Sequence, residues 1–558
     1  MTSRSEDAAP RPEEAVRDML GAAEPEGSRR LGELVERLEG EGRLRTVRPA
    51  GDGAIGSREV RGVAFDSRCV RAGYLFVAIP GAHSDGHDFI GAAAALGACA
   101  AIVESPAAGA AIPQIVVMDS RAALACAAAW WFRDPSRELG VVGITGTDGK
   151  TTTSFLVTAM LEAVGISTGM VTTAAVKIGP VRSANAEHIT TPEAPELQKM
   201  LRAMVSAGNE AAVVETTSHG LALERVGSID YDIAVFTNLS HEHLELHGSF
   251  EAYRDAKLSL FRRLLRRSRE LKHAGRDWPR AAIVNVDDAA SSHFERAARD
   301  AGATLITYGL RESAMVRATE VAEDTRSMRI DVVTPRWSDR VELQLAGRFN
   351  VHNALASIAV GEALGLPPEA IRAGLAGVAG VPGRMERVEC GQPFGVIVDY
   401  AHSPASLEKV LDLLAPLAQA QGGGLIVVFG SAGERDVQKR PMMGRIAGER
   451  CRLVVVTDED PRGEDSGAIL RQIADGALAA GGTSSRDVRC IADRAQAIAA
   501  AFEAARPGDV VLLAGKGHEQ SIIMADGPRP WDERSEAVKA LGRLGFGQGQ
   551  ENREEGRT

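Results

Sequence analysis

The 558-residue sequence predicts an α/β protein of several domains, and three observations support this prediction. Continuous runs of valine and isoleucine, such as "GVVGIT" (140–145) and "LIVVFG" (425–430), alternate with longer helical patterns. Unbroken apolar runs are typical of parallel strands that are covered on both faces. Many runs end in glycine or polar residues, and open α/β sheets bind their ligands at those carboxyl ends. The length predicts three or four domains at roughly 100–200 residues each.

Two loop-like segments, "FRDPSRELG" (132–140) and "GVAGVPGRMERVECGQPFG" (377–395), divide the chain into three parts. The flanking segments are rich in charged residues, proline or glycine, so we expect them to be disordered. The predicted division is a leader over 1–26, an N-terminal domain over 27–138, a central domain over 139–380, a C-terminal domain over 381–545 and a tail over 546–558.

Composition and charge exclude several classes of protein. The net charge of −11 argues against a general nucleic-acid binder, which needs a basic surface. The six cysteines lie far apart and form no C-x-x-C pair, so neither a zinc ribbon nor a disulfide framework is predicted. The charged N-terminus has no apolar segment of a secretory signal, and no apolar run is long enough to span a bilayer. We therefore expect a cytoplasmic protein.

The segment "GITGTDGKTTTSF" (143–155) predicts a phosphate-binding loop. It departs from the strict G-x-x-x-x-G-K-[ST] pattern, because Ile144 stands at the first position. An ordinary strand-to-helix turn is the alternative, but Gly-Lys-Thr-Thr at a helix start favours an anion site. Lys150 is expected at the β- and γ-phosphates of ATP, Thr151 at Mg²⁺, and the Asp148 carboxylate turned away from phosphate or toward a cation. The predicted ATP-binding residues of this loop are Gly146, Thr147, Asp148, Gly149, Lys150, Thr151 and Thr152.

The variant T-G-T-x-G-K-T resembles the Mur ligase family, which includes the folylpolyglutamate synthetases. An N-terminal segment, "DSRCVRAGYLFVAIPGAHSDGHDFI" (66–90), resembles the UDP-sugar domain of its MurE-type members, and the whole resemblance covers about residues 60–545. Further motifs follow in the family's order: "VVETTSHGL" (213–221), "TNLSHEHLELHGSFEAYRDAK" (237–257), "GRFNVHNALAS" (347–357), "GRMERV" (383–388), "VDYAHSPASLEKVL" (398–411), "FGSAGERDVQKRPMMG" (429–444), "TDEDPRGED" (457–465) and "AGKGHE" (514–519).

The resemblance implies an ATP-dependent amide ligase of cell-wall synthesis that works through an acyl phosphate. It implies a central P-loop-type ATPase domain with a mostly parallel sheet and a Rossmann-like C-terminal domain. The implied cofactors are ATP and Mg²⁺. The implied substrates are UDP-N-acetylmuramoyl-L-Ala-D-Glu and a diamino acid, and we expect a monomer.

The resemblance also assigns metal and ATP sites. Glu215 shares a Mg²⁺ with Thr151, and His243 binds a second one. Lys257, which on its own is an ordinary helix lysine, matches a lysine carried as a carbamate (N6-carboxylysine). From the residues alone, His241, His243 and His247 also fit a zinc site. The implied catalytic residues are Lys150, Lys257, His243 and Arg384, and the further ATP-binding residues are Asn350, Asn353, Arg384 and Asp399.

Two substrate pockets follow from the same resemblance. In the first, Leu223 replaces a usual glutamine and removes one polar contact. Residues matching the UDP-MurNAc-dipeptide site are Ser67, Thr190, Thr191, Thr217 and Arg225. Residues matching the amino-acid site are Arg435, Glu459, Asp460, Pro461, Arg462, Gly515 and Glu519.

The choice of diamino acid depends on "EDPR" (459–462), where diaminopimelate-specific members carry D-N-P-R. Arg462 and Glu519 match both ends of the meso-diaminopimelate zwitterion, so we favour this amino acid. Acidic residues near Arg462 are expected to occupy its guanidinium, which would favour lysine or ornithine instead; these residues are Glu459, Asp460, Glu464 and Asp465.

Two other functions fit parts of the sequence. A folylpolyglutamate-type synthetase lacks the UDP-sugar domain that residues 66–90 resemble. A non-catalytic, regulatory ATP-binding module would not need the intact catalytic set, which comprises Lys150, Thr151, Glu215, His243 and Lys257.

Overall fold

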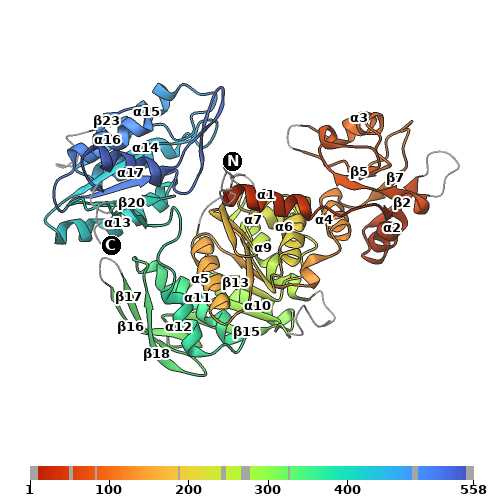
Figure 1. Ribbon diagram of the computed structural model, residues 1–558, viewed down its shortest axis with the longest axis horizontal. Helices are drawn as coiled ribbons and strands as arrows, with labels where there is room; N and C mark the ends of the chain where they lie inside the picture. The colour runs from red at the N-terminus through yellow and green to blue at the C-terminus, as the bar shows by residue number, and fades with distance from the viewer. Residues whose placement is uncertain are drawn as a thin grey trace, which may run out of the picture.

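The computed structural model describes residues 11–48, 55–81, 84–185, 189–240, 247–265, 277–323, 327–480 and 488–547. Three large sheets follow one another along the chain, and the central one joins the two outer units (Figure 1). Each of the three expected domain ranges encloses one of these sheets. The predicted α/β fold with mostly parallel sheets is confirmed.

The N-terminal unit is a five-stranded sheet in the order β2-β7-β6-β5-β4, parallel except for the edge strand β2. Its strands are β2 (Leu44–Arg48), β4 (Gly62–Ala64), β5 (Tyr74–Val77), β6 (Ala100–Val103) and β7 (Gln114–Val117). Helices α2 (Leu31–Gly40) and α4 (Ser120–Trp131) cover one face, and α3 (Ile90–Ala95) covers the other. A separate two-stranded sheet pairs β1 (Arg29–Arg30) with β3 (Glu59–Val60).

The expected disordered leader is wrong for Pro12–Ala22, which form helix α1. Val16 of this helix is buried in a cluster with residues of the central unit, and Met19 and Leu20 pack against that cluster. The charged residues of the leader conceal this apolar stripe, which becomes stable only when a partner surface covers it. The N-terminal segment therefore packs against the central unit rather than the N-terminal sheet (Figure 1).

The central unit is an eleven-stranded mixed sheet in the order β11-β10-β9-β12-β8-β13-β14-β15-β16-β17-β18. The strands from β9 to β16 in this order are parallel, and antiparallel strands extend the sheet at both ends. The strands are β8 (Gly140–Thr145), β9 (Thr168–Val171), β10 (Ala175–Ile178), β11 (Val181–Ala184), β12 (Ala211–Glu215), β13 (Ile233–Phe236), β14 (Ala281–Asn285), β15 (Thr304–Gly309), β16 (Val316–Glu323), β17 (Met328–Val333) and β18 (Ser338–Leu343).

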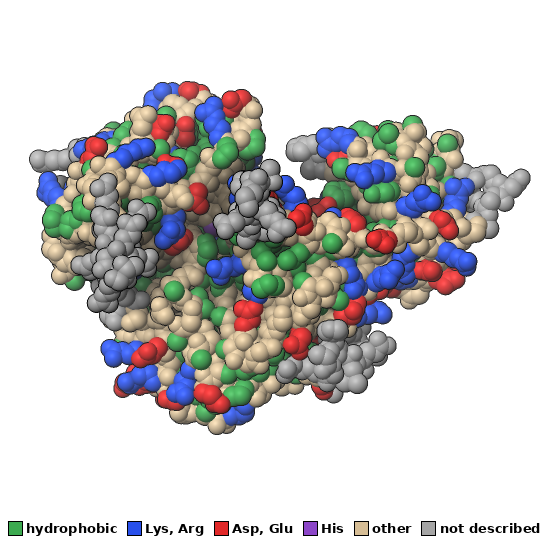
Figure 2. Space-filling model, in the orientation of Figure 1, with side chains coloured by type: hydrophobic (Ala, Val, Ile, Leu, Met, Phe, Trp, Pro, Cys, Tyr) green, Lys and Arg blue, Asp and Glu red, His purple; other side chains and the backbone are tan. Residues whose placement is uncertain are grey.

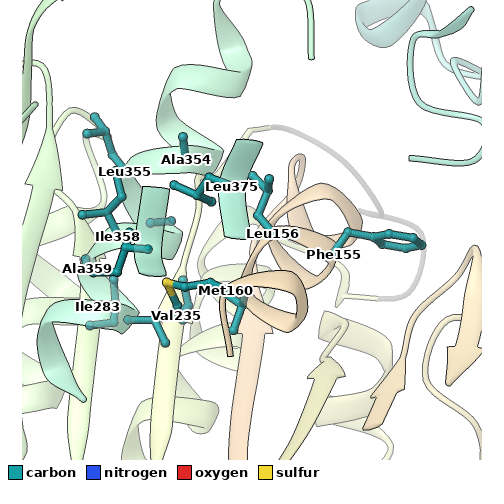
Figure 3. Packing of buried hydrophobic residues seen from close by; sticks show 14 of the residues in the cluster. Phe155, Leu156, Met160, Val235, Ile283, Ala354, Leu355, Ile358, Ala359 and Leu375 are labelled. Atoms are coloured by element: carbon teal, nitrogen blue, oxygen red, sulfur yellow. The ribbon is translucent and has the colours of Figure 1, made fainter. Parts of the chain in front are cut away.

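Helices cover both faces of this sheet. One face carries α5 (Lys150–Ala163), α11 (Phe349–Ala363) and α12 (Pro368–Ala376). Figure 3 shows Leu156 and Met160 of α5 packed among residues of α11 and α12 over Val235 and Ile283 of the sheet. The other face carries α6 (Ala194–Ser206), α9 (Phe250–Arg262) and α10 (Ser291–Asp300), and the short α7 (Ser218–Ala222) follows β12. Because both faces are covered there, the central strands β8 and β12 are fully buried and consist mainly of apolar residues.

The C-terminal unit is a six-stranded sheet in the order β19-β20-β24-β21-β22-β23, parallel except for β19. Its strands are β19 (Glu386–Arg387), β20 (Gly395–Asp399), β21 (Leu425–Phe429), β22 (Leu453–Val456), β23 (Val488–Cys490) and β24 (Val510–Ala514). One face carries α13 (Pro404–Ala420), α14 (Lys439–Arg450) and α15 (Ser466–Ala479), and the other carries α16 (Arg494–Ala504) and α17 (Glu533–Arg543). A hairpin of β25 (Ser521–Met524) and β26 (Gly527–Pro530) completes the unit.

The surface agrees with the charge balance of the sequence. Figure 2 shows basic and acidic side chains interspersed over the visible face of all three units. All six cysteines are free thiols. Among the described helices, none combines the length and apolar character that crossing a bilayer requires.

Candidate active site

The predicted phosphate loop lies at the centre of the molecule's largest sheet. Strand β8 runs between β12 and β13, both parallel to it, and ends at Thr145. Residues Gly146–Gly149 then turn the chain into α5, whose N-terminus has no side-chain cap. The first N–H groups of α5 therefore have no side-chain acceptor and, together with the helix dipole, favour a bound anion. Thr151 and Thr152 are buried in the first turn of this helix.

Gly149 is required by its surroundings. Its φ of +82° lies in the left-handed region, and a Cβ atom there would come within 2.2 Å of Asn353 Oδ1. We expect Gly149→Ala to weaken ATP binding about tenfold, because the loop must shift away from α11 to relieve this clash. Titration calorimetry with ATP would measure the loss. Gly165→Ala is the matched control, because Gly165 has a similar φ of +77° but open space around it. Equal affinities for the two variants would contradict the assigned role of the loop.

Lys150 lies folded over this loop. Its Nζ donates hydrogen bonds to the carbonyl oxygens of Gly146 (3.1 Å) and Thr147 (2.8 Å). These carbonyls hold the ammonium at the loop. Phosphate oxygens are charged and are therefore stronger hydrogen-bond acceptors for this ammonium than the carbonyls are. The position fits the predicted contact of Lys150 with the β- and γ-phosphates of ATP.

Thr151 and Glu215, the predicted Mg²⁺ ligands, are in direct contact. The Thr151 hydroxyl donates to Glu215 Oε2 at 3.0 Å, and the same oxygen accepts the Thr173 N–H at 3.0 Å. Glu215 ends β12 beside the loop and is 2% exposed. A hydroxyl and a carboxylate in contact at a buried site are a donor set that suits Mg²⁺, which prefers oxygen ligands.

Lys257 reaches the same loop from α9. Its side chain is 2% exposed, its Nζ donates to the Gly146 carbonyl at 2.7 Å, and it lies 4.4 Å from the centre of the Tyr253 ring. Glu215, Lys150 and Lys257 thus surround one short turn. His241 and His243 lie outside the described residues. The His247 ring contacts the rings of His219 and Tyr253, and burial lowers the pKa of its imidazole, with Lys257 acting in the same direction.

Four of the five residues predicted for the UDP-MurNAc-dipeptide site lie together. The Thr191 and Thr217 hydroxyls are 3.0 Å apart, and Thr191 also donates to the Glu215 carbonyl oxygen. Arg225 donates to the Thr191 carbonyl at 3.0 Å, and the Thr190 hydroxyl accepts from Thr173. The cluster therefore adjoins the Glu215 site. Ser67 lies in the N-terminal unit, in the 3-10 helix Ser67–Cys69.

The two asparagines of α11 line the opposite side of the loop. Asn353 Oδ1 accepts from the Thr153 hydroxyl of α5 at 3.3 Å and lies against Gly149, while its Nδ2 donates to Asn350 Oδ1 at 2.9 Å. Neither residue is the cap of α11, whose preceding residue is Arg348. The pair connects α11 to the start of α5.

Two predicted ATP residues come from the C-terminal unit. Arg384 Nη2 lies 3.4 Å from the Thr151 hydroxyl, and its guanidinium covers the Tyr400 ring at 4.8 Å. Asp399 ends β20 and accepts the N–H groups of Met385 and Ala401. Burial raises the pKa of Asp399, and the nearby Arg384 opposes this rise. The central and C-terminal units thus meet at Thr151.

The predicted amino-acid residues gather at the carboxyl ends of β22 and β24. Glu459 is buried, burial raises its pKa, and its Oε2 accepts no hydrogen bond from the described residues. A Cβ atom at Gly515 would lie 2.9 Å from this oxygen. Glu519 contacts the Tyr400 hydroxyl at 3.2 Å. Arg435 lies exposed in the loop between β21 and α14.

The expected capture of Arg462 by neighbouring acids is wrong. Asp460 Oδ1 instead accepts from Lys516 Nζ at 2.8 Å and from the Ile523 N–H at 2.9 Å. Glu464 pairs with Arg440 at 2.9 Å, and Asp465 caps α15. Among the described residues, Arg462 Nε is buried without a hydrogen-bond partner, and none of these three acids pairs with the Arg462 guanidinium.

Two lysines that the sequence did not single out lie at the candidate site. Lys516 is fully buried and bridges Asp460 and Glu519, the latter at 2.5 Å. It lies within the "AGKGHE" motif, which was a usable signal. Lys409 of α13 pairs with Asp148 of the phosphate loop at 2.8 Å. Lys409 lies within the motif at 398–411, but the sequence alone does not indicate its contact with Asp148, because the two residues are 261 positions apart.

Comparisons with known proteins cover most of the chain. Three family models match: "Mur ligase family, catalytic domain" over residues 59–131, "Mur ligase middle domain" over 144–361 and "Mur ligase, glutamate ligase domain" over 383–517. A UDP-N-acetylmuramyl-tripeptide synthetase of Roseiflexus sp. (strain RS-1) is 48% identical, with 88% of this chain and 96% of the relative covered.

Other relatives carry a more specific description. A UDP-N-acetylmuramoyl-L-alanyl-D-glutamate–2,6-diaminopimelate ligase of Geobacter metallireducens is 40% identical, with 90% of this chain and 98% of the relative covered. A solved structure with the same description is 29% identical and has a TM-score of 0.61, covering 89% of this chain and 97% of that one.

Proposed function

The chain belongs to the Mur ligase family, and we propose that it joins meso-diaminopimelate to the D-Glu carboxylate of UDP-N-acetylmuramoyl-L-Ala-D-Glu in an ATP-driven step of peptidoglycan synthesis. The observation that carries this proposal is the contact between the central unit and the C-terminal unit at the Thr151 hydroxyl. Thr151 contacts Glu215 of the central unit and Arg384 of the C-terminal unit. An enzyme that joins two substrates with ATP needs such a meeting point, because it must hold three reactants in line.

The proposed reaction has two steps. An oxygen of the D-Glu carboxylate attacks the γ-phosphorus of ATP. The bond between the γ-phosphorus and the bridging β-phosphate oxygen breaks, ADP departs, and the D-Glu carboxylate becomes an acyl phosphate. The amine of the diamino acid then attacks the acyl carbon, phosphate leaves, and the amine loses a proton. Both steps develop negative charge on phosphoryl oxygens, which the cations of Lys150 and Arg384 stabilise.

The phosphate loop also has the donors for a metal ion. Thr151 and Glu215 would hold Mg²⁺, with His243 as a ligand of a second ion, and Mg²⁺ would neutralise phosphate charge. Lys257 is proposed to carry a carbamate, which turns a buried ammonium into an anion beside this site. Because ATP and UDP-linked sugars are the reactants, we place the reaction in the cytoplasm.

The remaining substrates follow from the neighbouring clusters. The threonine cluster with Arg225 adjoins Glu215, so it would hold the dipeptide with its carboxylate near the γ-phosphate. Glu459 has an unpaired buried oxygen and would bind an ammonium, while Arg462 would bind the distal carboxylate of diaminopimelate. Lysine and ornithine lack this carboxylate, so they leave Arg462 without its partner.

The test of the proposed function is phosphate release from ATP. We expect release only when UDP-N-acetylmuramoyl-L-Ala-D-Glu and an amino acid are both present, with a tripeptide product detected by mass spectrometry. Release from ATP alone would identify a plain ATPase. Release that needs a folate substrate instead would identify a folylpolyglutamate-type synthetase.

The choice of amino acid gives a separate prediction. Arg462→Ala should lower kcat/KM for meso-diaminopimelate roughly 30-fold, which corresponds to about 2 kcal/mol of lost transition-state stabilisation, because a charge-assisted pair is lost. The values for lysine and ornithine should stay low and change little. Arg471→Ala is the matched control, since this exposed arginine pairs with Asp465 on α15. An equal loss for all three amino acids, or better use of lysine or ornithine by the wild type, would overturn the choice of diaminopimelate.

A further inference from the structure

The phosphate loop contains an acid at a position where a carboxylate opposes ligand binding. Asp148 stands between Thr147 and Gly149, two residues before the start of α5. Its backbone is fixed by Asn238, which accepts the Asp148 N–H through Oδ1 at 2.9 Å and donates to its carbonyl oxygen at 3.1 Å. These bonds hold the backbone of Asp148 in the loop, so its carboxylate stays close to the start of α5. At a helix N-terminus that binds phosphate, a fixed negative charge repels the ligand.

The carboxylate has a specific cationic partner from another unit. Lys409 Nζ of α13 donates to Asp148 Oδ2 at 2.8 Å. Burial acts to raise the pKa of Asp148, but the hydrogen bond and charge of Lys409, together with the charges of Lys150 and Arg384, outweigh it, and the pKa lies below its ordinary value. Lys150 and Arg384, the two cations directed at phosphate, act on Asp148 in the same direction as Lys409. The acid thus lies within the field of the phosphate site, and it remains ionised there.

We propose that Lys409 is a positioning residue for ATP binding. When the C-terminal unit is docked on the central unit, Lys409 neutralises Asp148, and the phosphate loop can then accept ATP. The inference rests on the proposed function, because it assumes that ATP binds at this loop. Without Lys409, the Asp148 carboxylate would compete for Lys150 and Arg384 and repel the phosphates. With Lys409 in place, those two cations remain available to ATP. Nucleotide affinity is then coupled to the position of α13.

A purely structural role would leave a different signature. The side chains of Lys409 and Asp148 are 60% and 46% exposed, and ion pairs of this exposure contribute little to stability. Removing the lysine should therefore leave the unfolding temperature unchanged. The effect on ATP should still be clear, because the ligand carries several negative charges near the uncovered carboxylate.

The experiment is a double-mutant cycle on the full-length protein, with ATP affinity measured by calorimetry and KM for ATP measured in the ligation assay. Lys409→Met should weaken ATP binding about fivefold to tenfold and raise KM while kcat is largely kept. Asp148→Asn should bind ATP more tightly than the wild type, because the repulsion is gone. In the Asp148→Asn background, Lys409→Met should cost less than about twofold. Added salt should shrink the Lys409→Met effect, because exposed charges are screened.

The matched control is Lys539→Met. Lys539 lies on α17, on the other face of the same sheet, is 62% exposed and pairs with Glu536 at 2.7 Å. The Lys539→Met variant should bind ATP like the wild type. Equal affinities for Lys409→Met and Lys539→Met would overturn the proposal. An undiminished Lys409→Met effect in the Asp148→Asn background would also overturn it, since Lys409 would then act on ATP directly. A wild type that binds no ATP, or releases phosphate without the UDP-linked substrate, would instead reject the proposed function.

Discussion

Lys150→Ala is expected to lower the ligation rate on the order of 10²-fold or more, which corresponds to roughly 3 kcal/mol of barrier. Lys150 folds over the carbonyls of Gly146 and Thr147, so its ammonium is already held at the turn that would receive the phosphates. The alanine variant removes that cation from the place where phosphoryl charge develops. Steady-state phosphate release with both substrates saturating would measure the loss in kcat.

The control for this prediction is Lys199→Ala. Lys199 lies on α6 and pairs with Glu24 at 2.7 Å, so its loss removes the same charge from a surface pair. Both variants should unfold near the wild-type temperature. If Lys150→Ala kept turnover within a few-fold of the control, the assignment of the phosphate loop would be wrong.

Lys257→Ala should be nearly inactive and should regain part of its activity when formate or acetate is added. The reason is that the proposed carbamate is an anion, and a small carboxylate can enter the space that the alanine leaves. Lys257 is 2% exposed and reaches the Gly146 carbonyl, so the vacated space adjoins the phosphate loop. Turnover as a function of carboxylate concentration would measure the rescue.

Lys150→Ala serves as the comparison, because a missing cation cannot be replaced by an acid and no rescue should occur. A carbon-13 spectrum of the active enzyme under labelled carbon dioxide should show a carbamate signal that Lys257→Ala lacks. An active enzyme whose crystal structure shows an unmodified Lys257 would reject the carbamate.

Much of the fold followed from local pattern. Strands such as β8 and β21 are buried on both faces, and this burial requires the continuous apolar runs that predicted them. The phosphate loop was predictable because its glycines, lysine and threonine are adjacent in the chain. Helix α1 was missed, because its apolar stripe is short and stable only against the central unit.

The sequence by itself determined the α/β class, the order of the three units and the types of residue available to the site. Only the tertiary structure decided which charges pair. Asp460 and Lys516 are 56 residues apart, and Asp148 and Lys409 are 261 apart, yet each pair is in direct contact. The physical reason is that charge interactions depend on distance in space and on burial, both of which the packing of the units sets. Arg462 forms no pair with Asp460 or Glu464 for the same reason, because the fold directs these acids toward Lys516 and Arg440.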